Sequence, residues 1–186
     1  MLLCDLQNSQ LLLVDIQERL VSAIKPKAAS RMVDNSIFLL QSAAIVGAPV
    51  IYSEQYPKGL GHTLSEVAGK IPESSSSLSK TCFSCTDSSD FCNVLDAGRN
   101  QVIIAGMESH VCILQTAMHL KDQGKEVFVV ADACAARSKH NHKNAMRRMA
   151  QAGIIITNSE SVVFEWLRDT SHAGFKEISV LLKQRG

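Results

Sequence analysis

Short, continuously apolar stretches that alternate with helix-like stretches constrain the fold of this chain more than any other feature. Apolar runs without an alternating polar face are typical of parallel strands buried on both faces, and the helix-like segments between them are typical crossovers. The pattern therefore predicts an α/β protein with a doubly wound, Rossmann-like, six-stranded parallel sheet sandwiched by helices. The expected strands are residues 10–15, 49–53, 77–82, 101–106, 126–131 and 154–157.

The segments between these strands carry apolar residues at a spacing near 3.6, which indicates amphipathic helices. Gly47, Gly124 and Gly153 follow three of them as stop signals. The 186 residues contain no Pro-rich linker and no repeat, so a single domain over residues 1–186 is expected. The expected helices are residues 30–46, 88–97, 111–121, 141–151, 159–167 and 175–183.

Charge and composition exclude several classes of protein. The 19 basic and 18 acidic residues give a formal net charge of +1, which argues against an obligate polyanion binder and against a polybasic membrane-surface protein. The apolar runs are also far shorter than the roughly 18 residues of a membrane span, so no membrane partner is expected. The first ten residues contain no Lys or Arg and lack the charged region of a signal peptide. We therefore expect a cytoplasmic protein whose six cysteines are free thiols.

Residues at the carboxyl ends of the strands are the candidates for chemistry, because ligands of such sheets bind there. Asp15 ends the first strand, and a buried carboxylate needs a partner, which Lys80 at the third strand can supply. Cys112 follows the fourth strand in the first turn of a helix, where backbone N–H groups favour a thiolate nucleophile and can hold an oxyanion. Structural alternatives are a buried ion pair and a buried cysteine. Glu54 and Gln55 follow the second strand, and Asp132 follows the fifth.

Other cysteine and histidine residues offer alternative sites. The spacing of Cys82 and Cys85 resembles half of a zinc site or a redox pair, but a structural zinc needs four ligands and no second such pair exists, so two incidental thiols are the plainer interpretation. His110 lies two residues before Cys112 and invites a Cys–His dyad, although that spacing rarely gives the required geometry.

Residues 137–148 form the one basic run of the chain. Such a run can contact phosphates, which would suit an RNA-binding protein or ribonuclease, or it can be a solvated helix face. The 5% aromatic content offers few stacking platforms for single-stranded RNA, so nucleic acid is not the expected partner. An interaction module with little turnover is a third alternative.

Three separated motifs resemble the isochorismatase-like cysteine hydrolases, a superfamily that includes nicotinamidases and N-carbamoylsarcosine amidohydrolases. They are LVDIQ at 13–17, KTCFS at 80–84 and GMESHVC at 106–112. The stretch SEQYPKGLG at 53–61 is similar to the isochorismatase domain-containing branch, some members of which are called mitochondrial-associated ribonucleases. Together with ADAC at 131–134 and FKEI at 175–178, the resemblance spans nearly the whole chain.

The resemblance implies a metal-independent hydrolase that acts on a small amide or related acyl substrate through a thioester. The family's triad falls on Asp15, Lys80 and Cys112. The family's cis peptide falls on Met107–Glu108, and the N–H groups of Glu108 and Cys112 would form the oxyanion hole. A homo-oligomer is implied by the resemblance only, and so is any mitochondrial association.

The substrate pocket is expected to be formed by residues close to these motifs in the sequence, and no cofactor is expected. Nicotinamidases bind a metal through an Asp-x-His pair after the second strand, which this chain lacks, so His62 is left alone and no catalytic metal is expected. Glu108 is more acidic than the residue usual in the family, and it either lines the pocket or points to solvent. The expected pocket residues are Gln17, Glu54, Gln55, Tyr56 and His110.

Overall fold

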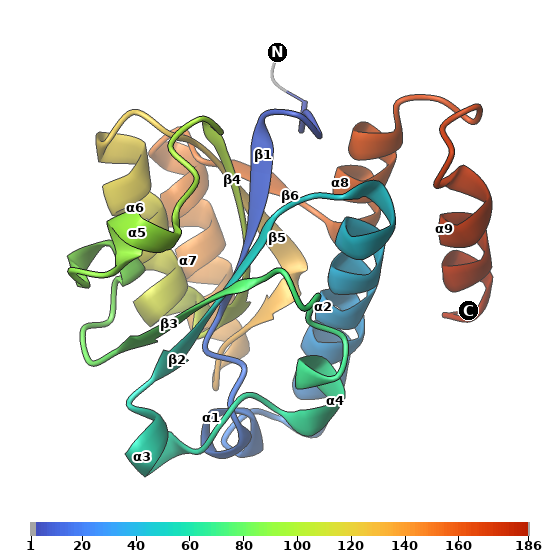
Figure 1. Ribbon diagram of the computed structural model, residues 1–186. Helices are drawn as coiled ribbons and strands as arrows, with labels where there is room; N and C mark the ends of the chain where they lie inside the picture. The colour runs from blue at the N-terminus through green and yellow to red at the C-terminus, as the bar shows by residue number, and fades with distance from the viewer. Residues whose placement is uncertain (1–2, 186) are drawn as a thin grey trace.

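Six parallel strands form one sheet, as the sequence predicts, and the structure shows their order to be β3-β2-β1-β4-β5-β6 (Figure 1). The computed structural model describes residues 3–185. The two central strands are buried along their whole length, which explains their unbroken apolar runs. The strands are β1 (Ser9–Val14), β2 (Val50–Gln55), β3 (Ser76–Lys80), β4 (Gln101–Met107), β5 (Glu126–Ala135) and β6 (Ile155–Thr157).

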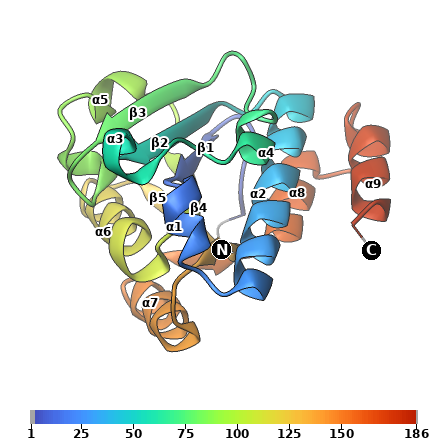
Figure 2. The same cartoon turned by 90° about the horizontal axis from the view of Figure 1, so that it is seen from below.

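Helices cover both faces of the sheet and enclose two apolar clusters (Figures 1 and 2). On β1, Leu11 and Leu13 belong to the cluster with α2 (Pro26–Val46) and α8 (Ser159–Leu167). Leu12 and Val14 belong to the cluster with α6 (Leu114–Asp122) and α7 (Lys139–Gln151). The alternation of side chains along the strand thus supplies both layers. The remaining helices are α1 (Glu18–Ser22), α3 (Pro57–Leu60), α4 (Ser65–Ala68), α5 (Phe91–Val94) and α9 (Phe175–Lys183).

The expected helix over residues 88–97 forms only in part, as the short α5 (Phe91–Val94). A 3₁₀ turn, η1 (Cys85–Asp87), precedes it. The Gln10 side chain holds the chain at Asp96 instead, since its Nε2 donates to the Asp96 carbonyl at 2.9 Å and its Oε1 accepts from the Asp96 N–H at 2.9 Å. The N–H and carbonyl of Asp96 are therefore bonded to a side chain of β1 and are not available for helical hydrogen bonds.

Asp132 lies inside β5 and does not follow it, because β5 continues to Ala135 past a register shift against β4. Its carboxylate accepts hydrogen bonds from the N–H and the hydroxyl of Ser159, both at 2.8 Å. Asp132 therefore stabilises the start of α8 and is not part of a site at the strand ends.

No helix within residues 3–185 combines the length and the apolar character needed to cross a membrane.

Gly106 allows the two central strands to approach closely where the candidate residues leave the sheet. Its φ of +119° lies in a region that side-chain-bearing residues rarely adopt. A Cβ at this position would overlap the Val14 carbonyl oxygen and lie 2.8 Å from the Val14 nitrogen. The next residue along β1 is Asp15, so this contact fixes the relative position of Asp15 and the loop after β4.

Gly106→Ala is expected to lower the free energy of unfolding by about 3 kcal/mol or more, because it adds overlap to an unfavourable backbone conformation. Gly124→Ala is the matched control, since its φ of +85° is also positive but nothing lies within 4 Å of the added Cβ. It is expected to cost about 1–2 kcal/mol. Urea denaturation measures both, and equal losses would contradict the close approach.

Candidate active site

A buried ion pair lies at the carboxyl edge of the sheet. Lys80, the last residue of β3, places its Nζ 2.7 Å from Oδ2 of Asp15, which directly follows β1. Both side chains are 0% exposed. The expectation that Lys80 is the partner of Asp15 is confirmed, although 65 residues separate the two in sequence.

The strand between them, β2, completes the pair. Ser53 Oγ donates to Asp15 Oδ1 at 2.7 Å, and Lys80 Nζ donates to Gln55 Oε1 at 2.7 Å. Ser53 and Gln55 are two positions apart on a strand, so their side chains share one face. Each buried charge therefore has a hydrogen-bond partner in addition to its counter-ion, which a buried ion pair requires.

The charges of the pair influence each other. Burial has the largest single effect and would lower the pKa of the Lys80 ammonium, but Asp15, together with the thiols of Cys112 and Cys85, raises it, so the net shift of the pKa is upward. Lys80 is therefore a permanent cation at this edge of the sheet.

Cys112 lies beside this pair in a π-helical turn, η2 (Ser109–Ile113), that continues into α6. Its side chain is buried, with 6% of the residue exposed. The pKa of the Cys112 thiol is raised to about 12, first by burial and then by the Asp15 carboxylate, while the Lys80 ammonium opposes the rise. Burial therefore opposes the thiolate that the helix start and the lysine favour.

The loop that joins β4 to Cys112 is held at two points. The Met107–Glu108 peptide is cis, as the resemblance implies. The Glu108 carboxylate accepts from the Nε and the backbone N–H of Arg137, both at 3.1 Å, so its side chain is directed toward β5 and not into solvent. Ser109 Oγ donates to the Ala135 carbonyl at 2.9 Å.

Two of the expected pocket residues support the ion pair directly or through a neighbour. Gln55 contacts Lys80, as described above. Gln17 accepts from the Gln55 N–H at 2.7 Å and donates to the carbonyls of Gln55 and Gly61, at 3.0 and 2.6 Å. Gln17 therefore positions β2 and the loop after it.

Glu54 does not face the ion pair. It alternates with Ser53 and Gln55 along β2, and its Oε1 accepts from the N–H and hydroxyl of Thr63 at 2.7 and 2.9 Å. Its Oε2 lies 3.1 Å from His62 Nδ1, so His62 is paired and not alone. The expectation that Glu54 lines the pocket is wrong because a strand presents successive side chains to opposite faces.

Tyr56 and His110 lie at the edges of the site. Tyr56 is 55% exposed and lines, with Lys80, a cavity of about 550 Å³. His110 Nε2 lies 3.2 Å from Asn141 Nδ2, so its ring is engaged with α7.

Sequence reasoning missed Ser53 and the position of Cys85 beside it. Side chains two positions apart on a strand point to the same face, so the position of Gln55 could have predicted that Ser53 faces the site. Cys85 is fully buried with its Sγ 3.7 Å from Ser53 Oγ, and burial is the main cause that raises the pKa of its thiol to about 11. All six cysteines are free thiols, Cys82 and Cys85 included. Within the described part of the chain, no three His, Cys, Asp or Glu residues are grouped so that they could hold a metal.

Comparison with known proteins places this geometry in a family. A family model described as the isochorismatase domain matches residues 9–161. Isochorismatase domain-containing protein 1 of Danio rerio is 41% identical over 170 residues, which cover 91% of this chain and 59% of that protein. The chain thus spans less than two thirds of this relative. Isochorismatase domain-containing protein 2A of Mus musculus is 37% identical over 183 residues, which cover 96% of this chain and 84% of that protein.

Solved structures agree over nearly the whole chain. The MAR1 ribonuclease of Caenorhabditis elegans superimposes with a TM-score of 0.92 at 35% identity, covering 98% of this chain and 93% of that one. YcaC of Escherichia coli, described as an octameric hydrolase of unknown specificity, superimposes with a TM-score of 0.86 at 25% identity, covering 100% and 97%. From the matched domain, the relatives and the shared fold, the chain belongs to the isochorismatase family and has its hydrolase fold.

Proposed function

We propose that this protein is a metal-independent cysteine hydrolase that cleaves a small amide or related acyl compound through an Asp15–Lys80–Cys112 triad. The observation that carries the proposal is the buried Lys80–Asp15 pair, whose two charges both act on the Cys112 thiol. A carboxylate and an ammonium beside a protonated thiol supply a base for its proton and a cation for the resulting thiolate.

In the first half-reaction Asp15 accepts the proton of the Cys112 thiol as the sulfur attacks the substrate carbonyl carbon. The carbon–sulfur bond forms, and the carbonyl oxygen takes up the electron pair as an oxyanion. The backbone N–H groups of Glu108 and Cys112 donate to that oxyanion. The carbon–nitrogen bond then breaks, and Asp15 returns the proton to the leaving amine or ammonia.

In the second half-reaction water replaces the amine. Asp15 accepts a proton from the water as its oxygen attacks the thioester carbonyl carbon. Collapse of this intermediate breaks the carbon–sulfur bond, releases the carboxylic acid and leaves the sulfur to regain the proton from Asp15. Lys80 keeps its charge in both halves and holds Asp15 in place at 2.7 Å.

The burial of the site supports a small substrate. Only 6% of Cys112 is exposed, so the reacting carbonyl must sit on a slender group to reach the sulfur. As part of the same proposal, the chain assembles as a homo-oligomer, in line with the octameric E. coli relative.

An RNA-directed activity is the second candidate, since the C. elegans relative is named a ribonuclease. The basic run at 137–148 was its expected contact surface. In the structure this run is divided, because Arg137, Lys139 and Lys143 line one cavity and Arg147 and Arg148 do not line it. Because the basic residues are not aligned along α7, the arrangement favours binding of a compact anion over binding of an extended RNA strand.

A panel of small amides and ureides is expected to yield at least one substrate, and Cys112→Ala is expected to lower its turnover by about 10⁴-fold or more, as the loss of a catalytic nucleophile does. Released ammonia or amine is the measurement. Cys134→Ala is the matched control, because Cys134 is another buried cysteine whose thiol pKa is raised to about 12 by burial, and it is expected to retain activity. RNA cleavage that persists in purified Cys112→Ala, with no amide cleaved by wild type, would favour the second candidate.

Lys80→Met is expected to reduce the free energy of unfolding by about 3–5 kcal/mol, because Asp15 would remain buried without its counter-ion. The double variant with Asp15→Asn no longer buries an unpaired carboxylate, so it should recover most of the lost free energy of unfolding. Urea denaturation measures stability and the amide assay measures turnover. The double variant should fold well and remain inactive, and an active double variant would show that the pair is structural only.

Activity is expected to survive chelation. Glu54 and His62, the pair nearest in sequence to the family's metal position, bind each other at 3.1 Å, and Glu54 also accepts two bonds from Thr63. Dialysis against a chelator, with elemental analysis before and after, should leave turnover unchanged. A metal at one equivalent per chain whose removal abolishes turnover would overturn the metal-independent mechanism.

A further inference from the structure

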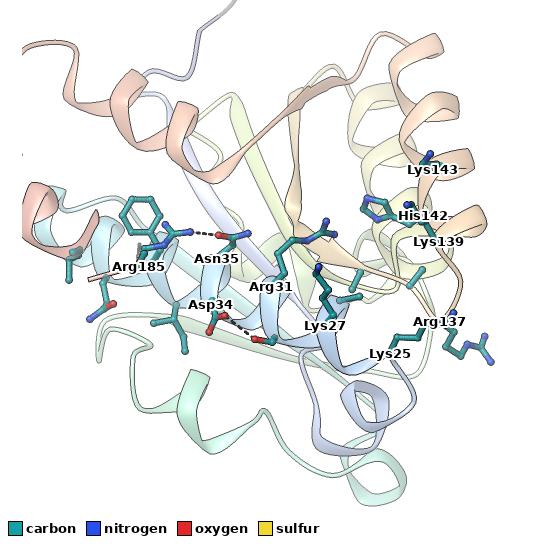
Figure 3. Close-up of a pocket in the computed structure, with 18 of the residues that line it drawn as sticks. Lys25, Lys27, Arg31, Asp34, Asn35, Arg137, Lys139, His142, Lys143 and Arg185 are labelled. Carbon is teal, nitrogen blue, oxygen red and sulfur yellow. Dashed lines mark hydrogen bonds between the residues drawn. The ribbon is translucent and has the colours of Figure 1, made fainter. Parts of the chain in front are cut away.

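A large cavity between the start of α2 and the start of α7 is lined by cations (Figure 3). Its volume is about 1170 Å³. Arg185, which follows α9, closes one end, and Asp34 is the one carboxylate among the described lining residues. The other cations are Lys25, Lys27 and Arg31 from the start of α2 and Arg137, Lys139 and Lys143 around the start of α7.

Most of these charges are not compensated by the protein. Arg137 is paired with Glu108, and Arg185 bonds Asn35 and lies 4.0 Å from the centre of the Phe38 ring. Asp34 accepts from the Ser30 hydroxyl at 3.0 Å. Within residues 3–185, no side-chain hydrogen bond or ion pair is formed by five of the cations, namely Lys25, Lys27, Arg31, Lys139 and Lys143.

The residues at the starts of α2 and α7 have the opposite charge from that usual at the start of a helix. The amino-terminal end of a helix carries partial positive charge and favours acidic residues. Both α2 and α7 lack an acidic residue in the first turn, and both begin at this cavity with lysines. The positive ends of two helices and five unpaired cations meet at one cavity, and their like charges repel one another. An anion bound there would relieve this electrostatic repulsion and so stabilise the protein.

His142 adds a polar group to the wall between the two helices. Figure 3 shows its ring extending from α7 toward Arg31 of α2. Its Nδ1 lies 2.9 Å from Ser109 Oγ, whose single proton is donated to the Ala135 carbonyl. If that proton goes to Ala135, His142 Nδ1 donates to Ser109, and His142 Nε2 can donate to a phosphate oxygen only when the ring is protonated. Burial, and then the charge of Arg31, lowers the pKa of His142.

We propose that this cavity binds a small molecule that carries two or more adjacent phosphate groups. Lys25 and Arg31 are six residues apart, or about 9 Å along α2, which exceeds the reach of one phosphate group and fits a chain of them. The cations face the cavity from α2 on one side and α7 on the other, so both sides of a compact polyanion are contacted. The volume leaves room for an organic group attached to the phosphates.

Single-stranded RNA fits this cavity less well. Binding of single strands relies on exposed aromatic faces on which bases stack. Phe38, the aromatic residue among the described lining residues, is 1% exposed and covered by Arg185. The exposed aromatic side chains of Tyr56 and Phe83 do not line this cavity.

The cavity is separate from the Lys80–Asp15 pair but shares a loop with it. Arg137 holds Glu108, and His142 contacts Ser109. A bound phosphate competes with Glu108 for the Arg137 guanidinium, so an occupant acts on the loop that leads to Cys112.

Isothermal titration of the full chain with inorganic pyrophosphate and tripolyphosphate, at about 0.15 M ionic strength, tests the proposal. Saturable binding at one site per chain is expected. Lys139→Gln with Lys143→Gln should weaken it by about tenfold or more, since two charge-assisted contacts are lost. Arg147→Gln with Arg148→Gln is the matched control, because it removes the same charge from the same helix outside the cavity, and it should leave affinity nearly unchanged.

Two further measurements keep the test decisive. Circular dichroism checks that each variant is folded, and Arg31→Gln on α2 replaces the α7 variant if that one is not. The ring resonances of His142 should shift on saturation with pyrophosphate. Absence of saturable binding, or equal weakening in the cavity variant and the control, would overturn the proposal. Binding of a uridine oligonucleotide, with none of either polyphosphate, would replace it with an RNA-binding face.

Discussion

The buried pair between Lys80 and Asp15 is the interaction on which the rest of the site depends. Removing two charges from water costs several kcal/mol for each ion, so the pair is stable only where geometry and hydrogen bonds compensate for that cost. Here Ser53 and Gln55 bind one member each, and Gln17 fixes Gln55. Three parallel strands in register bring these side chains together. The polar site is therefore a property of the sheet and not of a single loop.

The same burial determines the resting state of the candidate nucleophile. The pKa of the Cys112 thiol is raised to about 12 by burial and then by Asp15, which is the base in the proposed mechanism. A nucleophile that stays protonated until a substrate arrives is less exposed to oxidation than a free thiolate. The cationic cavity lies on the other side of the 107–109 loop, where Arg137 and His142 reach it.

The sequence predicts the sheet and its polar edge because parallel strands leave unbroken apolar runs and end at a common edge. Asp15, Lys80 and Cys112 could be named on that ground. Glu54 was wrongly placed because strand alternation was not applied to the end of β2. The partners of Cys85 and the end of β5 at Ala135 depend on contacts between distant segments. The same is true of the cavity, which α2, α7 and the C-terminal residues form together.

Peptide-mapped mass spectrometry of the wild-type protein, quenched during reaction with p-nitrophenyl acetate, tests the central claim most directly. The account predicts one acetyl group, on Cys112, that is removed by neutral hydroxylamine as a thioester is. It also predicts that Asp15→Asn fails to acquire this group, because the buried thiol then lacks its base. Acetylation confined to other cysteines, such as the exposed Cys92, or equal acetylation of Cys112 in Asp15→Asn, would contradict the account.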